Sequence, residues 1–247
     1  MKSIERIIDH LIVLASPAQM VEISNLLEKA GLQVRDEVVE ASLGVRSRLL
    51  PIAGGGFIEV ASELSRGSFA HAKHGNPFDI TPRLVSVSYT TDDVVADLAR
   101  WRGIPGAQNA RAQAGGWRRQ DGTFGYFVGV SPTPLAGDVF FGLQERRLFP
   151  LPYLDSARSA PAVRQIKVAG PDAGMWKQRH AQLFALPQKD GVLRAGATEL
   201  LFQQESAAAT QITATLAVSN PNVAIPLAAG RFDFVPSNAA GSTAHAC

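Results

Sequence analysis

The order strand, capped helix, glycine and three short strands occurs twice in the first half of the chain, and this repeat constrains the fold more than any other feature. The first copy covers residues 6–62, and the second begins at Leu84. In the first copy Ser16 and Pro17 are typical of a helix start, and Gly31 is typical of a helix end. The period of roughly 80 residues is long for a solenoid and predicts two βαβββ units.

The strands of both copies are bounded by turn residues. In the first copy, residues 45–52 and 56–62 form an expected hairpin across Ala53-Gly54-Gly55. In the second copy we expect Thr91 to cap a helix that ends at Gly103. Three further strands are expected near residues 107–114, 122–131 and 138–145.

A third, weaker copy begins at Val163. A strand over 163–169 precedes a helix with Trp176 and His180, and strands near 192–195 and 198–204 come next. We therefore divide the chain into residues 1–150, a pair of βαβββ units, and residues 151–247, a degenerate βαβ-type unit with a β-rich tail. The fold class is α+β.

Composition excludes some partners. Hydrophobic residues make up 46% and charged residues 19% of the 247 residues, as in ordinary soluble domains. The net charge is +2 and the basic residues are scattered, which argues against a nucleic-acid partner.

The sequence shows no features of a secreted or membrane-bound chain. Cys247 is the single cysteine, so no disulfide can form within the chain. The early apolar run from Ile7 to Ala15 is too short for a membrane span. We expect a cytoplasmic protein with no membrane partner.

Several fragments together resemble a known family. They are IDHLIVLASP, FIEVASE, VSVSYTTDDVVADLARW, RRQDGTFGYFVGV and VFFGLQE. In order and spacing they are similar to glyoxalase-like domain proteins of the vicinal oxygen chelate superfamily, over about residues 6–150. The resemblance implies paired βαβββ modules whose mixed sheet curves into a cup, with helices outside and often a divalent metal at the base.

The candidate metal ligands are His10 on the first strand, Glu59 on the last strand of the first unit, and Glu145 on the last strand of the second. Gln144 replaces Glu145 if the register differs by one residue. One histidine and two carboxylates suit a divalent ion such as Fe, Mn, Zn, Ni or Mg, which would act as a Lewis acid, and Glu59 and Glu145 are also the candidate catalytic groups. The alternative is a core histidine and a solvated glutamate.

The chain departs from the family at two places. Relatives often carry a histidine and a Gly-Thr-x-Asn run where this chain has Gly44 to Arg48. The second unit has Val85 and Ser86 where a metal enzyme of the superfamily carries another ligand. Both departures put a metal in doubt.

Candidate substrate-binding residues lie on neighbouring strands. Arg46 and Arg48 are two residues apart, so they share one face of a strand. If that face lines the cup, they favour a carboxylate or phosphate; otherwise they lie in solvent. Trp117, Phe127 and Phe141 are expected to form walls of the site, or to be plain core.

His71 and His74 lie in the long connection between the two units. Their spacing suits a metal or a proton shuttle, although loop histidines are more often solvated.

Three functions follow from this sequence. The first is a metal-dependent lyase, isomerase or dioxygenase acting on a small oxygenated molecule, including an anionic one. The second is a protein of the same fold that sequesters a small molecule without catalysis. The third is a structural or regulatory role. A homodimer is left open.

Overall fold

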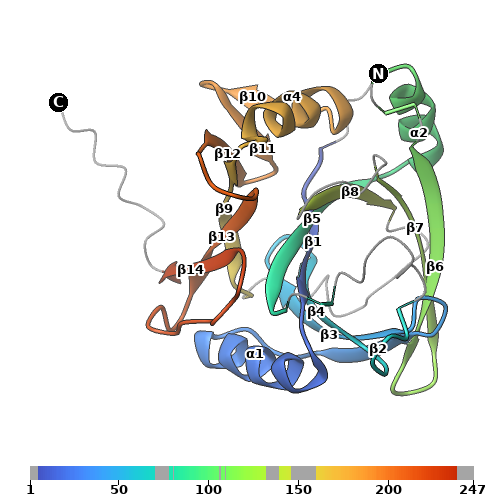
Figure 1. Ribbon diagram of the computed structural model, residues 1–247, viewed down its shortest axis with the longest axis vertical. Helices are drawn as coiled ribbons and strands as arrows, with labels where there is room; N and C mark the ends of the chain where they lie inside the picture. Colours follow the sequence, from blue (N-terminus) through green and yellow to red (C-terminus); the bar gives the residue numbers. More distant parts are fainter. Residues whose placement is uncertain are drawn as a thin grey trace.

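The computed structural model describes residues 5–69, 78–79, 81–105, 107–108, 110–131, 139–145 and 160–237. Its strands form a closed barrel of eight and, beside the barrel, a sheet of six (Figure 1). Within the described ranges, no helix is both long and apolar enough to cross a membrane.

The first half of the barrel is one βαβββ unit. Its elements are β1 Ile8–Leu14, α1 Pro17–Ala30, β2 Asp36–Glu40, β3 Val45–Ile52 and β4 Gly56–Glu63. β4 runs parallel to β1, β3 pairs antiparallel with β4, and β2 pairs antiparallel with β3. The predicted hairpin between β3 and β4 is therefore present.

The second half repeats the same pairings. Its elements are β5 Arg83–Thr91, α2 Val94–Arg102, β6 Arg111–Arg119, β7 Phe124–Ser131 and β8 Phe140–Glu145. β8 runs parallel to β5, and β7 and β6 follow antiparallel. Antiparallel pairs β1–β5 and β2–β6 join the two units and close the ring. The predicted fold of repeated βαβββ modules is confirmed, and the curved sheet is a closed barrel.

The six-stranded sheet follows the same plan a third time. Its elements are β9 Ala162–Gly170, α4 Ala173–Leu183, β10 Gln188–Lys189, β11 Val192–Ala195, β12 Thr198–Gln204, β13 Gln211–Val218 and β14 Arg231–Pro236. β12 runs parallel to β9, and β11 and β10 follow antiparallel. The third copy is thus a complete βαβββ unit.

The last two strands have the pairings of a shortened fourth unit. β13 pairs antiparallel with β9 as β5 does with β1, and β14 runs parallel to β13 as β8 does to β5. Residues 219–230 join β13 to β14 directly, where a full unit has a helix and two strands. The second sheet stays open because it lacks the two strands that a full unit would have between β13 and β14.

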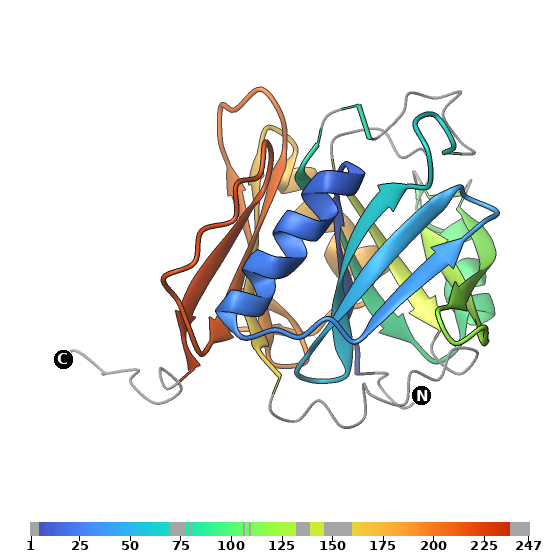
Figure 2. The same ribbon diagram turned by 90° about the horizontal axis from the view of Figure 1, so that it is seen from below.

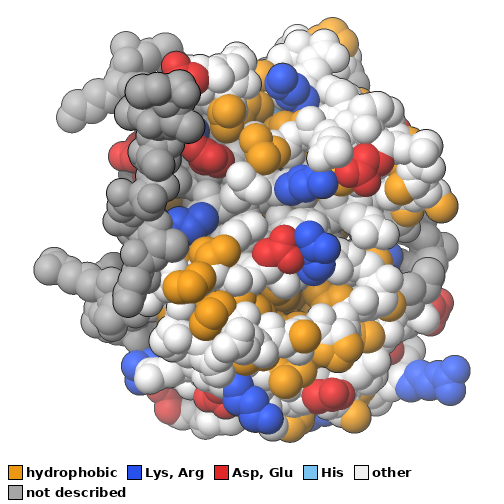
Figure 3. Space-filling model, turned by 90° about the vertical axis from the view of Figure 1, so that its left-hand side faces the viewer, with side chains coloured by type: hydrophobic (Ala, Val, Ile, Leu, Met, Phe, Trp, Pro, Cys, Tyr) orange, Lys and Arg blue, Asp and Glu red, His pale blue; other side chains and the backbone are white. Residues whose placement is uncertain are grey.

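The outer face of the open sheet is polar in part. Figure 3 shows charges of both signs between hydrophobic side chains on this side of the molecule. Lys167 Nζ lies 3.3 Å from Glu205 Oε1, and Arg231 Nε lies 2.7 Å from Asp233 Oδ1. Exposed pairs of this kind contribute little to stability, so the outer face is a solvated surface.

Local sequence explains how α1 begins and ends. Ser16 Oγ accepts a hydrogen bond from the Gln19 backbone, and the Gln19 side chain accepts one from the Ser16 backbone at 2.9 Å. Gly31 has φ 110°, and a Cβ at this position would overlap Ser219 Oγ beside β13. Figure 2 shows α1 along the seam between the barrel and the second sheet.

The start of α2 differs from the prediction. Asp93, and not Thr91, is the N-cap residue, and its carboxylate accepts a hydrogen bond from the Ala96 backbone. Thr91 Oγ1 instead accepts a hydrogen bond from the Asp93 backbone at 3.2 Å. The aspartate side chain lies closer to the helix along the chain and therefore reaches the free N–H groups.

Alternate residues of the barrel strands have two different surroundings. Leu11 and Val13 of β1 and Ile58 and Val60 of β4 lie in the main hydrophobic core, which also contains residues of α1, α4 and the second sheet. The residues between them point into the barrel. This alternation decides which side chains can form a site.

A buried ion-pair network attaches α4 to the barrel. The Asp97 carboxylate accepts hydrogen bonds from Arg6 at 2.6 and 2.8 Å, from Arg100 at 2.7 Å and from Thr91 at 2.5 Å. Arg6 and Arg100 also donate to carbonyl oxygens at the end of α4, including Leu183 O. Burial alone would raise the pKa of Asp97, but Thr91, Arg100 and Arg6 together hold it below its ordinary value of 3.8.

We expect Asp97→Asn to lower the free energy of unfolding by about 3–5 kcal/mol, because it leaves the buried Arg6 without its counter-charge. The depressed pKa means that this stabilisation is present above the ordinary pKa and is lost as pH falls below it. Denaturant unfolding at pH 7 and pH 3 measures both effects. The exposed neighbour Asp92 is the control, and equal effects of Asp92→Asn and Asp97→Asn would contradict the role of the network.

Candidate functional site

His10 and Glu59 point into the barrel from adjacent strands. His10 pairs with Phe57 in the β1–β4 ladder, and Ile12 pairs with Glu59, so all four lie on the inward face. The rings of His10 and Phe57 stack with centroids 5.2 Å apart and planes 13° apart. The structure therefore places both predicted side chains on one surface.

Asp9 contacts His10, which strand alternation alone did not predict. The pairing of β1 with β5 shifts register between Ile8 and His10. His10 Nδ1 lies 2.7 Å from Asp9 Oδ1, and both side chains are buried. A hydrogen bond to this carboxylate requires a proton on Nδ1, so Nε2 is the ring nitrogen that faces away from Asp9.

Glu59 has a hydroxyl partner on the neighbouring strand. Ser47 Oγ of β3 donates to Glu59 Oε1 at 2.7 Å, and both residues are buried. The carboxylate thus keeps a fixed orientation on the inward face of the barrel. One oxygen is partly satisfied by this bond, and the carboxylate has capacity to accept more.

Glu40 of β2 is a second inward carboxyl group, and the sequence analysis missed it. It follows inward-facing Val38 by two residues, and its side chain is 7% exposed. Burial, followed by the negative charge of Glu59, raises its pKa to about 7, against hydrogen bonds from Trp117 and Ser42. A glutamate two residues after the apolar Val38, and so on the same face of the strand, was the signal available in the sequence.

An aromatic wall lies beside the two carboxyl groups. Trp117 of β6 is 5.8 Å from the ring of Phe57 and 5.6 Å from the ring of Phe127 on β7, measured between ring centroids. A Cβ on Gly115 would lie 2.5 Å from Glu40 Oε1 and would overlap the Phe127 ring. Glycine at this position therefore lets Phe127 and Glu40 approach the wall of the barrel.

We call six of these residues the inner cluster. They are His10, Glu40, Phe57, Glu59, Trp117 and Phe127. Phe127, unlike the other five, is only partly buried, as are Phe140 and Gln144 of β8, which also point inward. Water therefore reaches the inward face of β7 and β8.

Ser86 of β5 is a buried polar residue whose hydroxyl has no partner among the described residues. It pairs with Ile12, which in turn pairs with Glu59, so Ser86 and Glu59 lie on the same inward face with Ile12 between them. Ser86 Oγ is fully buried and makes no hydrogen bond within the part of the chain that the structure describes. An unpaired buried hydroxyl costs free energy and calls for an explanation, such as a ligand or an ordered water.

Glu145 does not join the cluster, whereas Gln144 points inward. Glu145 Oε2 accepts a hydrogen bond from the Val94 backbone at 3.2 Å, at the start of α2 outside the barrel. A Cβ on inward-facing Gly129 would lie 2.7 Å from Gln144 Oε1. The register of β8 thus differs by one residue from the prediction, and Glu145 caps a helix because its strand faces α2.

Arg46 and Arg48 share one face of β3, as predicted, but it is the outer face. Arg46 Nε donates to Ser62 Oγ at 3.4 Å, and Ser62 contacts Met20 of α1. Arg48 Nε donates to Glu37 Oε2 at 3.2 Å. Because Ser47 and Leu49 point inward, the two arginines lie outside the barrel, which is the solvent alternative, and they do not line its interior.

Phe141 also lies outside the barrel. Its ring packs against Trp176 and His180 of α4, with centroids 4.7 and 4.4 Å away. It belongs to the core between barrel and second sheet, whereas Phe127 faces the interior. His71 and His74 lie outside the described residues.

The three predicted metal ligands are not brought together. Glu145 is outside the barrel, so only His10 and Glu59 of the three face its interior. Among the described residues, no three histidine, cysteine or acidic side chains form a group that could hold a metal. The residues present do not fit the metal that the family resemblance implies.

Comparison with known proteins gives the fold and no closer relationship. No family model matches the sequence, and no curated protein does. A hypothetical protein from Staphylococcus aureus aligns over 94% of this chain and 99% of its own, with TM-score 0.67 and 9% identity. A mutant of 4-hydroxymandelate synthase from Streptomyces coelicolor aligns over 87% of this chain and 72% of its own, with TM-score 0.56 and 14% identity.

The protein has the vicinal oxygen chelate fold. A fusion protein of a xylose isomerase-like TIM barrel and 4-hydroxyphenylpyruvate dioxygenase also aligns over 87% of this chain and 36% of its own, with TM-score 0.50 and 15% identity. These identities are low, so the likeness concerns the fold and not the activity.

We expect Glu40→Gln to stabilise the protein at pH 8. The raised pKa means that the folded protein binds more protons than the unfolded chain between the ordinary value of 4.5 and about 7, so Glu40 makes stability fall as pH rises through this range. The loss in the free energy of unfolding is roughly 3 kcal/mol, because each unit of difference in pKa corresponds to about 1.4 kcal/mol. Denaturant unfolding at pH 5 and pH 8 tests this.

Glu37→Gln is the matched control, since Glu37 lies on the outer face of the same strand and pairs with Arg48. Its effect should stay within about 0.5 kcal/mol at both pH values. An equal pH dependence in the parent and in Glu40→Gln would show that Glu40 has an ordinary pKa.

Proposed function

We propose that this protein is a glyoxalase-like small-molecule-binding protein that takes its ligand into the barrel at the inner cluster. One observation carries the proposal: the barrel interior holds the buried carboxyl groups of Glu40 and Glu59 beside an aromatic wall, and the Ser86 hydroxyl on the same inward face has no partner among the described residues. A barrel with a purely structural role gains more from apolar side chains, because buried polar groups without partners cost free energy.

The aromatic wall supports a planar ligand. Phe57, Trp117 and the partly exposed Phe127 offer ring faces and edges on one side, and the imidazole of His10 stacks on Phe57. Sites for small molecules typically combine such apolar walls with a few polar groups that fix orientation. Glu40, Glu59 and Ser86 would supply the polar contacts.

Catalysis is the second candidate, and one feature of Glu40 favours it. A carboxyl group with a pKa near 7 can both give and take a proton at neutral pH. The carboxylate of Glu59 nearby would stabilise a positive charge that develops on a substrate. Structures of this fold include 4-hydroxymandelate synthase. A metal-dependent lyase, isomerase or dioxygenase would need metal ligands beyond His10 and Glu59. Elemental analysis of the protein and of His10→Ala distinguishes this enzyme from a binding protein without catalysis. Stoichiometric metal in the parent protein that is lost in the variant favours the enzyme.

We expect Phe127→Ala to reduce the affinity for small aromatic probes such as phenol and indole by about three- to tenfold, which corresponds to 0.5–1.5 kcal/mol of ring contact. Calorimetric titration and thermal shift measure the change.

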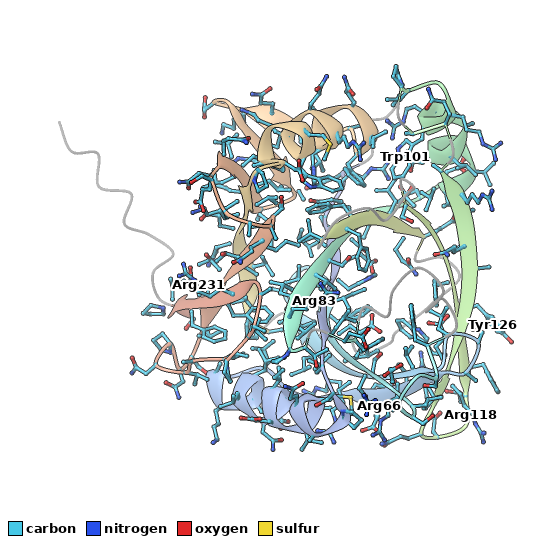
Figure 4. The ribbon with its side chains drawn as sticks, in the orientation of Figure 1. Arg66, Arg83, Trp101, Arg118, Tyr126 and Arg231 are labelled. Carbon is cyan, nitrogen blue, oxygen red and sulfur yellow. The ribbon has the colours of Figure 1, made fainter. Side chains whose placement is uncertain are left out.

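Tyr126→Ala is the control variant. Tyr126 is the preceding residue on β7, is 62% exposed, and points away from the barrel (Figure 4). Its replacement should leave probe binding unchanged. Probe binding that is indifferent to Phe127, or equally sensitive to both residues, would refute a site inside the barrel.

A further inference from the structure

We infer that the ligand of the inner cluster is an organic cation, with an ammonium or protonated ring nitrogen held between Glu40, Glu59 and the aromatic wall. This inference rests on the proposed function, and it replaces the anionic ligand that the sequence suggested. Three independent features of the barrel interior lead to it.

The first feature is an uncompensated pair of carboxyl groups. The influences on the pKa of Glu40 are burial, the charge of Glu59, and two hydrogen bonds, and none of them is a positive charge. Arg119, which points inward on β6, forms an ion pair with Asp36 at 3.3 Å. His10 Nδ1 lies 2.7 Å from Asp9 Oδ1, so this ring nitrogen faces another carboxylate. A ligand cation would supply the counter-charge that the described residues do not give Glu40 and Glu59.

The second feature is the aromatic wall next to these carboxyl groups. Trp117 contacts Phe57 edge-on and Phe127 in a tilted arrangement, and its side chain also forms a hydrogen bond with Glu40. Ring faces attract ammonium groups, and several rings with a carboxylate form the usual cage for such ligands. A neutral planar ligand would use the rings but would leave the carboxyl groups without a counter-charge.

The third feature is the Ser86 hydroxyl. Its oxygen is fully buried, has no partner among the described residues, and lies on the same inward face as Glu59. A hydroxyl can accept a hydrogen bond from an N–H group or donate to a ligand oxygen. It therefore marks a place where a bound molecule would satisfy a group that the protein leaves unpaired.

The test compares three probes that share a phenyl ring and differ in charge: benzyltrimethylammonium, benzyl alcohol and phenylacetate. Calorimetric titration at pH 8 should show the cation binding at least about tenfold more tightly than the alcohol, with phenylacetate weakest. Glu40→Gln and Glu59→Gln should each reduce the preference for the cation to about twofold or less, while Glu37→Gln should retain it.

The pH profile gives a second readout. The trimethylammonium group does not titrate, so affinity should rise from pH 6 to pH 8 as Glu40 loses its proton. Glu40 faces Glu59 of β4 and Trp117 of β6, with Ser42 beyond the end of its own strand, and none of these except Glu59 carries a charge. The profile should be flat in Glu40→Gln, which is expected to fold at least as stably as the parent.

The outcomes separate this inference from the proposed function. One outcome is that benzyl alcohol or phenylacetate binds as tightly as the cation and that Phe127→Ala weakens this binding. It would overturn the inference of a cationic ligand but would support the proposed site. A flat profile in the parent protein would also overturn the cation. No binding of any probe would overturn the site and the cation together.

Discussion

The closed barrel gives each of its strands two faces with different neighbours, and the rest of the structure depends on how residues are divided between them. On β1, Leu11 and Val13 pack against the helices and the second sheet, whereas His10 and Ile12 point inward. A shift of one residue would exchange these sets, bury Glu59 in the apolar core and expose Ile58 and Val60 to the interior. The apolar outward residues therefore hold the inner cluster in place.

The second sheet packs against one side of this barrel and does not itself close into a second barrel. β9 to β12 repeat the full unit, but β13 and β14 lack the intervening helix and strands, so the sheet cannot close. Its apolar face is covered instead by packing on the outside of the first barrel, where Phe141 meets His180. Full burial lowers the pKa of His180 to about 3, so it is a neutral core residue. The outer face carries Gln165, Lys167 and Leu201 on β9 and β12, with no histidine among its described residues.

The chemistry of the barrel interior follows from the burial of two carboxyl groups close to each other. Glu40 and Glu59 repel each other, and burial makes the charged form of Glu40 costly. Asp97 is also a buried carboxyl group, yet it has a depressed pKa, because two arginines and a threonine contact it. Asp97 therefore acts as a structural link that has its counter-charges in Arg6 and Arg100. Among the described residues, none of the influences on the pKa of Glu40 is a positive charge. This contrast supports the proposed role of Glu40 and Glu59 in ligand binding.

Local patterns in the sequence were sufficient for the elements and their order. The Ser16 capping box, the left-handed Gly31 and the glycine turn after β3 act between residues close in the chain, so neighbouring residues alone reveal them. Hydrophobic alternation likewise placed His10 and Glu59 on one face. Glu40 was missed because its raised pKa depends on burial inside the barrel and on the charge of Glu59, which is distant in sequence.

The sequence by itself thus determined the repeated βαβββ units, both ends of α1 and the inward position of two candidate side chains. Only the tertiary structure decided the rest. It assigned Glu145 to the start of α2, directed Arg46 and Arg48 outside, and left Ser86 unpaired inside. The physical reason is that packing on one face of a strand decides which residues point into the barrel. This packing joins residues that are far apart in the chain.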